Sequence, residues 1–291
     1  GKLSHESPLE LFQKTLDNWK SESNELSAVG YISYDFKNIL FPHIAFSNPN
    51  STQPLLWFGK PKLVVPYRIT ESELETASPV FRLKKDIPPP HEYKESIRKI
   101  KTALSNGDSY QINFTQPKKF EITDNPLEIY LSIREMARPH YGMYLNQKDF
   151  QILSFSPEQF FRTKNRKIES FPMKGTRPRS NDLIMDERLA GELFQSVKDR
   201  AEHLMIVDLI RNDLGKICDY DSVKVDDLYG IQSFETVHQM VSRVSGQLQN
   251  SITESDIIRA LFPGGSITGA PKEKSMEIID TLEGYQRGIY T

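Results

Sequence analysis

The stretch KDRAEHLMIVDLIRNDLGKIC (residues 198–218) carries most of a long amphipathic pattern with helical spacing. The pattern predicts one helix over about 187–213 that ends near Gly215. An amphipathic helix buries its apolar face against another layer. The segments on either side of this helix therefore decide the fold.

Strand patterns and helix patterns are interleaved around this helix. Segments rich in β-branched and aromatic residues predict strands at 28–36, 55–69, 109–116 and 150–172. Helical spacing, with Asn125, Thr253 and Pro271 as start signals, predicts helices at about 93–104, 125–137, 254–262 and 271–283. This interleaving predicts an α+β fold.

A run of prolines marks the predicted domain boundary. In DIPPPHE (86–92) three successive prolines can neither continue a helix nor pair in a sheet. We therefore predict a partial, β-rich N-terminal region at 1–90 and a larger region at 91–291.

Composition excludes several classes of protein. Of 291 residues, 37 are Lys or Arg and 39 are Asp or Glu, which argues against a nucleic-acid-binding protein. The single cysteine, Cys218, excludes an internal disulfide and indicates a reducing compartment. The sequence shows neither an apolar run of membrane-spanning length nor a signal-peptide pattern in residues 1–20. We expect a cytoplasmic globular protein that does not act at a membrane.

Two carboxylates on the long helix are candidate metal ligands. Spacing of three and four residues places Asp199, Glu202, His203 and Ile206 on one face. A pair of carboxylates one turn apart suits Mg²⁺, which takes few protein oxygens and keeps its waters. Spacing alone nevertheless favours a solvated helix face, because acidic residues at this spacing are common on surface helices.

Two turns offer further candidates. SFSPEQFF (154–161) places Glu158 among phenylalanines, where desolvation would raise its pKa as a general acid requires. An exposed turn glutamate is the alternative, and the local sequence favours it. LFPGGSITGAPK (261–272) could bind a carboxylate through Ser266 and Thr268, or be a plain glycine turn. It is not a nucleotide-binding phosphate loop, because Ala270 and Pro271 follow Gly269.

MKGTRPR (173–179) contains a candidate nucleophile, Lys174. A lysine becomes nucleophilic when burial or nearby cations lower its pKa, and Arg177 and Arg179 are possible neighbours. Most lysines are exposed, so the segment alone favours a solvated loop residue.

Taken together and in this order, the segments resemble the chorismate-utilising enzymes, which include anthranilate, aminodeoxychorismate, isochorismate and salicylate synthases. The matching segments are GDSYQINFTQ (107–116), SFSPEQFF (154–161), MKGTRPR (173–179), KDRAEHLMIVDLIRNDLGKIC (198–218), VHQMVSRVSGQL (237–248) and LFPGGSITGAPKEKSMEIIDTLEGYQRGIYT (261–291). They are spread along nearly the whole of the predicted region at 91–291, whereas GYISYDF (30–36) resembles the family's N-terminal region only loosely.

This resemblance implies a layered fold with large antiparallel sheets flanked by helices around a cleft. It also implies chorismate as substrate and a Mg²⁺ ion at its ring carboxylate. Glu202 resembles the metal-ligating glutamate and Asp199 the acidic residue one turn earlier, while Glu158 resembles the general acid that helps the C4 hydroxyl leave. The positions that resemble substrate-binding residues are Gln111, Gly175, Thr176, Gly265, Ser266 and Thr268.

Lys174 separates the branches of the family. It resembles the aminodeoxychorismate synthase branch, whereas the other branches have alanine there. The implied mechanism is covalent: lysine attacks C2 as the C4 hydroxyl leaves, and ammonia from a glutamine amidotransferase partner enters at C4 and expels the lysine. Gln111 stands where the isochorismate and salicylate branches have a lysine that activates water, so water addition is disfavoured. Anthranilate synthase and a non-catalytic chorismate-binding protein are the alternatives.

The sequence departs from the family pattern in two places. The family's active-site histidine matches Gln239, and the adjacent His238 would point to the opposite face of a strand, so we assign it no role. Family members also continue beyond the position of Thr291 with a second metal-binding glutamate and a Tyr and Arg that hold the substrate carboxylate. We therefore expect little or no turnover from a polypeptide that ends at Thr291.

Overall fold

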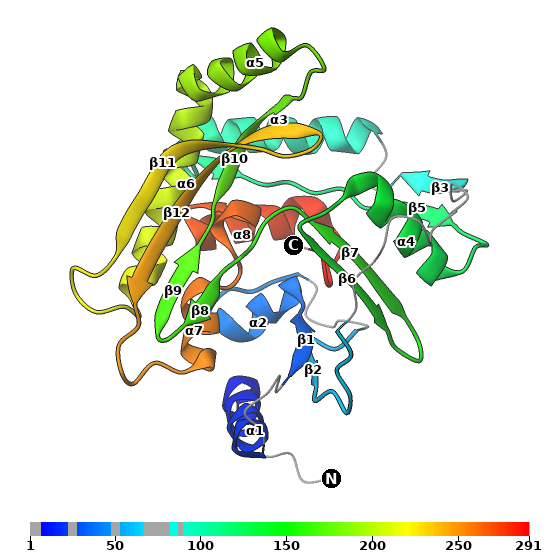
Figure 1. The fold of residues 1–291 in the computed structure, drawn as a ribbon, viewed down its shortest axis with the longest axis vertical. Coiled ribbons are helices and arrows are strands. Elements are labelled where there is room, and N and C mark those ends of the chain that lie inside the picture. The colour runs from blue at the N-terminus through cyan, green and yellow to red at the C-terminus, as the bar shows by residue number, and fades with distance from the viewer. Residues whose placement is uncertain (1–6, 23–27, 48–52, 67–81, 87–89, 291) are drawn as a thin grey trace.

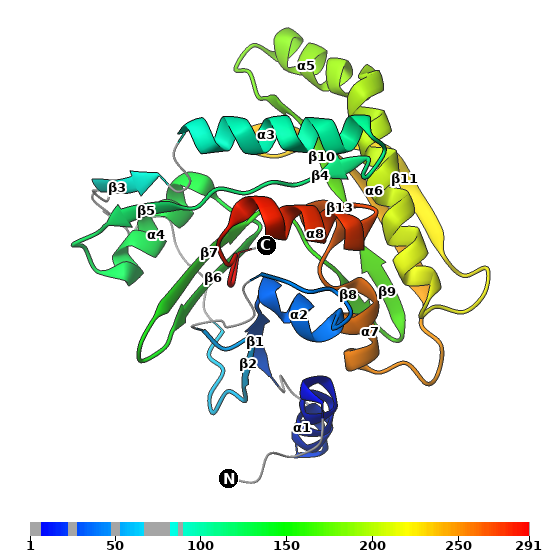
Figure 2. The same cartoon turned by 180° about the vertical axis from the view of Figure 1, so that it is seen from behind.

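The structure is a computed structural model that describes residues 7–22, 28–47, 53–66, 82–86 and 90–290. Helices and antiparallel strands alternate along the chain, and two of the helices, α5 (Leu183–Gln195) and α6 (Val197–Gly215), pack on one face of the largest sheet (Figures 1 and 2). The predicted α+β class is confirmed. Among the described residues, no helix has both the length and the apolar character needed to cross a membrane.

The largest sheet has five antiparallel strands. These strands are β8 (Arg162–Lys164), β9 (Lys167–Ser170), β10 (Met173–Pro178), β11 (Lys224–Ser233) and β12 (Val237–Gln247). β12 lies in the middle: it pairs with β11 on one side and with β10 and then β9 on the other. Alternate residues of β12, from His238 through Met240 and Ser242 to Val244, are buried on the face that the helices cover.

The long predicted helix is in fact two helices, α5 (Leu183–Gln195) and α6 (Val197–Gly215). Ser196 separates them with an extended backbone, and its hydroxyl accepts a hydrogen bond from the backbone N–H of Asp199. This is an N-cap that begins a new helix. The single helix predicted over 187–213 was wrong because apolar spacing continued across the break, whereas Ser196 followed by Asp199 was the local signal for it.

The other predicted helices are confirmed within a few residues. They are α3 (Pro90–Ser105), α4 (Pro126–Ala137), α7 (Glu254–Leu261) and α8 (Lys272–Glu283). Asn125 caps α4, and Thr253 forms a capping box with Asp256 at the start of α7. α6, α7 and the sheet enclose a core that includes Leu214, Val244 and the buried Cys218. Burial raises the pKa of this cysteine to about 11, which keeps the thiol protonated and unreactive.

The N-terminal part contains more helix than the predicted β-rich region. Its elements are α1 (Pro8–Glu22), β1 (Val29–Ile32), the 3₁₀ turn η1 (Tyr34–Phe36), α2 (Lys37–Leu40), β2 (Leu56–Gly59) and β3 (Arg82–Asp86). α1 was not predicted, although Leu9, Phe12 and Leu16 recur at helical spacing and are buried against Ile258 and Phe262. Residues 67–69 of the second predicted strand and the prolines 88 and 89 at the boundary lie outside the described residues. The boundary near residue 90 stays a prediction.

Short antiparallel pairs complete the fold and bring distant segments to one place. They involve β4 (Gln111–Ile112), β5 (Lys118–Glu121), β6 (Tyr141–Asn146), β7 (Gln151–Ser156) and β13 (Gly269–Ala270). β6 pairs with β7, β3 with β5, β1 with β2, and β4 with β13. Only Gln111–Ile112 of the strand predicted at 109–116 is a regular strand. Its pairing with β13 places it beside the glycine loop before α8.

Candidate active site

Three segments converge on the carbonyl and hydroxyl of Ser266. Lys174 lies on β10, and its Nζ donates a hydrogen bond to the Ser266 carbonyl oxygen at 3.3 Å. Glu158 lies in the turn after β7, and its carboxyl interacts with the Ser266 side chain, which lines the same cavity. Ser266 itself lies in a 3₁₀ turn, η3 (Gly265–Ile267), between α7 and α8. The structure therefore brings together three of the predicted site residues.

Glu158 borders a cavity of about 190 Å³. The cavity is lined by Ser156, Pro157, Glu158, Phe160, Phe262, Gly264, Ser266 and Ile267. Burial raises the pKa of Glu158 to about 7, and the positive charge of Lys174 only partly offsets this effect. Phe160 is the one predicted aromatic neighbour in the lining, because Phe155 stacks on Tyr130 and Phe161 packs against the core under the sheet.

Burial also lowers the pKa of Lys174 below its ordinary value, against the opposing negative charges of Glu158 and Glu202. Of the two causes named from the sequence, burial or nearby cations, burial is the one that acts. Arg177 and Arg179 do not contribute, because Arg177 pairs with Asp199 at 2.9 Å and Arg179 pairs with Asp186 at 2.8 Å.

Both shifts raise the share of the neutral form, which is a protonated carboxyl on Glu158 and an unprotonated amine on Lys174. Burial disfavours the charged form of each group, although attraction between the charged forms works against it. A neutral carboxyl can donate a proton, and a neutral amine can attack carbon. The site is thus arranged for one proton donor and one nucleophile.

Gly175 allows β10 to pass close to the helices. Its φ is +74°, and a Cβ at this position would lie 2.8 Å from Cδ1 of Leu193 and 3.1 Å from Cβ of Asp199. The register between β10 and β12 also shifts here, between Lys174 and Thr176. Glycine is needed because both the backbone angle and the space exclude a side chain.

We expect Gly175→Ala to lower the free energy of unfolding by about 1–3 kcal/mol, since it combines a left-handed backbone with a steric clash. Gly191→Ala is the matched control, because Gly191 lies within α5 and nothing lies within 4 Å of an added Cβ. The control should be neutral or stabilise by up to about 1 kcal/mol. Urea denaturation measures both, and equal values for the two variants would contradict the assignment.

The other predicted substrate-binding residues lie around this centre in different roles. Thr176 is exposed on β10. Gln111 lies on β4, and its Oε1 is buried with no hydrogen-bond partner among the described residues. Thr268 is fully buried, and its hydroxyl donates to the Gly264 carbonyl at 2.9 Å, so it holds the loop together and does not face the cavity. Gly265 packs so closely on α6 that a Cβ would lie 2.2 Å from Leu209.

The two predicted metal ligands differ in how tightly other side chains already bind them. The Glu202 side chain is 39% exposed and lies 3.8 Å from Lys198, whereas Asp199 is bound by Arg177. Over the described ranges, no group of three or more Asp, Glu, His or Cys side chains forms a metal site. This donor set fits Mg²⁺, which can bind through one or two carboxylates and keep several waters. Glu202 would be the ligand, and Asp199 could join only after releasing Arg177.

His203 lies on the helix face that spacing predicted, but its contact with the sheet could not be predicted from spacing. It is fully buried on α6, and its Nε2 lies 2.6 Å from Oγ of Ser242 on β12. Burial, reinforced by the charge of Lys174, lowers its pKa to about 4. His203 is therefore a neutral imidazole beneath the site.

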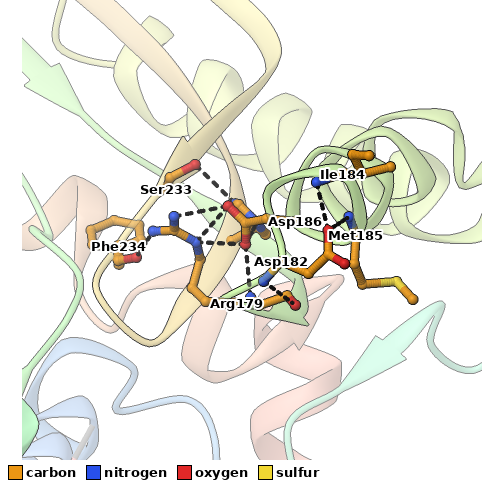
Figure 3. A network of polar contacts seen from close by, with 9 residues as sticks. Arg179, Asp182, Ile184, Met185, Asp186, Ser233 and Phe234 are labelled. Atoms are coloured by element: carbon orange, nitrogen blue, oxygen red, sulfur yellow. Dashed lines mark hydrogen bonds and ion pairs between the residues drawn. The ribbon is translucent and has the colours of Figure 1, made fainter.

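A separate polar network around Arg179 and Asp186 fixes the C-terminal end of β10 (Figure 3). His238 joins this network through Asp186. Its Nε2 lies 2.9 Å from Asp186 on α5, and its Nδ1 lies 2.9 Å from Oγ of Ser233. Arg179 binds the same carboxylate through two nitrogens, which together with the Ser180 backbone N–H holds the pKa of Asp186 well below its usual range. His238 thus joins β12 to α5. Its side chain is buried on the face of β12 opposite to that of the neighbouring Gln239, as predicted.

Comparison with known proteins agrees with this fold. A model of the chorismate binding enzymes matches residues 2–291, and the chain belongs to this family. Aminodeoxychorismate synthase component 1 of Bacillus subtilis is 43% identical over 199 residues, which cover 68% of this chain and 42% of that protein. Anthranilate synthase component 1 of Saccharolobus solfataricus is 37% identical over 200 residues, 69% of this chain and 48% of that protein. The matched part of this chain therefore covers less than half the length of either relative.

Solved structures agree on the fold. Anthranilate synthase component I of Streptococcus pneumoniae has a TM-score of 0.82 at 25% identity, over 100% of this chain and 73% of that one. An isochorismate synthase of Bacillus anthracis has a TM-score of 0.72 at 21% identity, over 98% of this chain and 73% of that one, which shows the fold alone. The family resemblance drawn from the sequence is confirmed.

Proposed function

We propose that this chain carries the chorismate-aminating activity of aminodeoxychorismate synthase component I, which forms 4-amino-4-deoxychorismate for the p-aminobenzoate and folate route. The observation that supports it most directly is the pair of Lys174 and Glu158, which meet at Ser266 with their pKa values shifted towards the neutral forms. The relatives at 43% and 42% identity that bear this name add to that support.

The proposed reaction has two displacements. Neutral Lys174 forms a bond from Nζ to C2 of chorismate, both ring double bonds shift, and the C4 hydroxyl leaves as water with a proton from Glu158. Ammonia then forms a bond to C4, both double bonds shift back, and the Nζ–C2 bond breaks. The leaving lysine regains its electron pair, and the proton lost from the new ammonium group on C4 returns to the Glu158 carboxylate.

Glu202 and an ammonia source complete the proposal. A Mg²⁺ ion bound by Glu202 would neutralise the ring carboxylate of the substrate. The ammonia would come from a glutamine amidotransferase subunit, in keeping with the word component in the names of the relatives. The cytoplasmic location expected from the single cysteine stays a prediction.

Anthranilate synthase is the second candidate, favoured by the relative at 37% identity and the structural match with a TM-score of 0.82. The two activities differ in their products, because anthranilate synthase also releases pyruvate. Lys174 argues for the first candidate, since a covalent lysine is required only there.

One experiment decides between them. The full-length protein is incubated with chorismate and Mg²⁺, first without ammonia and then with ¹⁵N-labelled ammonium, and both protein and products are analysed by mass spectrometry. We expect a covalent adduct on Lys174 without ammonia and ¹⁵N-labelled 4-amino-4-deoxychorismate with it. Labelled anthranilate and pyruvate would establish the second candidate. Binding of chorismate by calorimetry, with no adduct and no product, would indicate a non-catalytic chorismate-binding protein.

A further inference from the structure

A buried guanidinium lies directly behind the loop that carries Ser266. The side chain of Arg287 is 1% exposed. Its Nη1 donates to the carbonyl of Ile267 at 2.7 Å, and its Nη2 donates to the carbonyl of Asn113 at 2.6 Å. Arg287 therefore joins the residue after Ser266 to the strand segment opposite it.

Glu283 on α8 neutralises this arginine. Nη2 and Nε of Arg287 lie 2.7 Å and 2.9 Å from the two carboxylate oxygens, and the Glu283 side chain is 2% exposed. The carboxylate also accepts from the backbone N–H and the hydroxyl of Thr115 at 2.8 Å and 2.9 Å. A buried ion pair adds little stability compared with apolar residues, because desolvation offsets its attraction. The Arg287–Glu283 pair therefore matters here for the position in which it holds the guanidinium.

Asn113 extends this geometry to the proposed catalytic groups. Its side-chain amide donates a hydrogen bond to the Ser266 carbonyl oxygen, which is the same oxygen that accepts from Nζ of Lys174. The backbone N–H of Asn113 donates to the Thr268 carbonyl at 2.8 Å. Arg287 and Asn113 thus hold the loop on both sides of Ser266, and Ser266 contacts both Lys174 and Glu158.

The segment GYISYDF (30–36) holds Arg287 from the other side. The guanidinium lies 4.5 Å from the ring centre of Tyr34. The neighbouring Gly288 donates its N–H to Asp35 at 2.9 Å, and its carbonyl accepts from the N–H of Tyr34 at 2.7 Å and from the hydroxyl of Ser33 at 2.8 Å. The N-terminal segment therefore contributes to the position of the active-site loop.

We propose that Arg287 and Asn113 are positioning residues that fix the Ser266 carbonyl, and through it the direction in which Lys174 points. A free lysine side chain samples many rotamers, and an error of about 1 Å in a reacting group can cost about 10²-fold in rate. The inference rests on the proposed function, since it assigns these residues to the amination carried out by Lys174.

The test uses Arg287→Gln and Asn113→Ala in the full-length protein, with Lys272→Met as the matched control. Lys272 also forms a buried ion pair, 2.6 Å from Asp213, and donates to the Leu261 carbonyl before the loop. One readout is the hydrogen exchange of the backbone amides of Ile267 and Thr268. The other is steady-state kinetics together with the rate of adduct formation at Lys174.

We expect both test variants to speed amide exchange in the loop by about tenfold or more. We also expect them to lower kcat and the adduct rate by about 10–100-fold, with KM for chorismate within about threefold of the wild type. Lys272→Met should leave both readouts within about threefold after correction for its loss of global stability. If Arg287→Gln does not fold, Asn113→Ala carries both readouts, because it removes one side-chain hydrogen bond to Ser266.

Wild-type exchange in the loop of the test variants would overturn the positioning role, as would a wild-type adduct rate. Equal losses in Lys272→Met would also overturn it. The effects would then follow from the loss of any buried ion pair near the loop and not from the contacts of Arg287 and Asn113. A wild-type protein that forms no adduct and no product would instead overturn the proposed function. In that case the exchange measurement alone decides whether Arg287 and Asn113 fix the loop.

Discussion

Replacing Lys174 by alanine should abolish adduct formation and lower the amination of chorismate by at least about 10³-fold. The reason is chemical: without an amine at C2, the C4 hydroxyl must leave without the covalent intermediate that divides the reaction into two easier steps. The substrate should still bind, because Glu158, Ser266 and Glu202 remain in place. The measurements are ¹⁵N incorporation into product and the intact mass of the protein after incubation with chorismate.

Lys174→Arg distinguishes a nucleophile from a fixed positive charge. Arginine keeps the charge but is always protonated and cannot attack carbon. We expect it to be as inactive as Lys174→Ala. Lys164→Ala is the control, since Lys164 lies exposed on β8 and should leave the rate unchanged. Full aminodeoxychorismate output by Lys174→Ala would refute the covalent role, and substantial activity of Lys174→Arg would reduce Lys174 to an electrostatic contribution.

Local signals predicted the parts of the fold that local interactions determine. Asn125 and Thr253 began α4 and α7 as their side-chain chemistry indicated, because a cap is decided within about one turn of helix. The break at Ser196 was equally local but was hidden by apolar spacing that continued across it. α1 was missed because the first 90 residues were expected to be β-rich, although Leu9, Phe12 and Leu16 recur at helical spacing in the sequence.

The site depended on contacts that no local pattern encodes. Burial of Lys174, which lowers its pKa, comes from segments distant in the sequence, and Ser266 lies 92 positions away along the chain. Arg287 and Asn113 are separated by 174 positions, so spacing could not join them. Family resemblance placed Lys174, Glu158 and Ser266 in one site, but it gave no account of what holds that site in shape.

Replacing Glu158 by glutamine should lower kcat by about 10²–10⁴-fold, because the C4 hydroxyl then leaves without a proton donor. The pH dependence identifies the group. With a pKa of about 7, Glu158 is protonated at pH 6 and largely ionised at pH 8, so wild-type activity should fall as pH rises through about 7. Glutamine cannot titrate, and this alkaline limb should disappear from the residual activity of the variant.

Glu158→Gln, which should lower kcat, should raise the stability of the folded protein. Burial raises the pKa of Glu158 from 4.5 to about 7, so the folded state binds the proton more tightly than the unfolded state. The tighter proton binding by Glu158 contributes to the free energy of unfolding. This contribution is fully present below about pH 4.5 and is lost as pH rises through about 7, and the loss is about 3 kcal/mol. Glu158→Gln removes this loss, so we expect it to gain up to about 3 kcal/mol relative to wild type between pH 4 and pH 8.

Urea denaturation at the two pH values measures this difference, with Glu187→Gln on the exposed surface of α5 as the control. The control should show no pH-dependent gain. A Glu158→Gln variant that is inactive and gains no stability at pH 8 would show that Glu158 is ionised without cost, and its role as general acid would then be wrong. A gain in stability together with loss of activity would mean that burial of this carboxyl lowers the stability of the protein but is needed for catalysis.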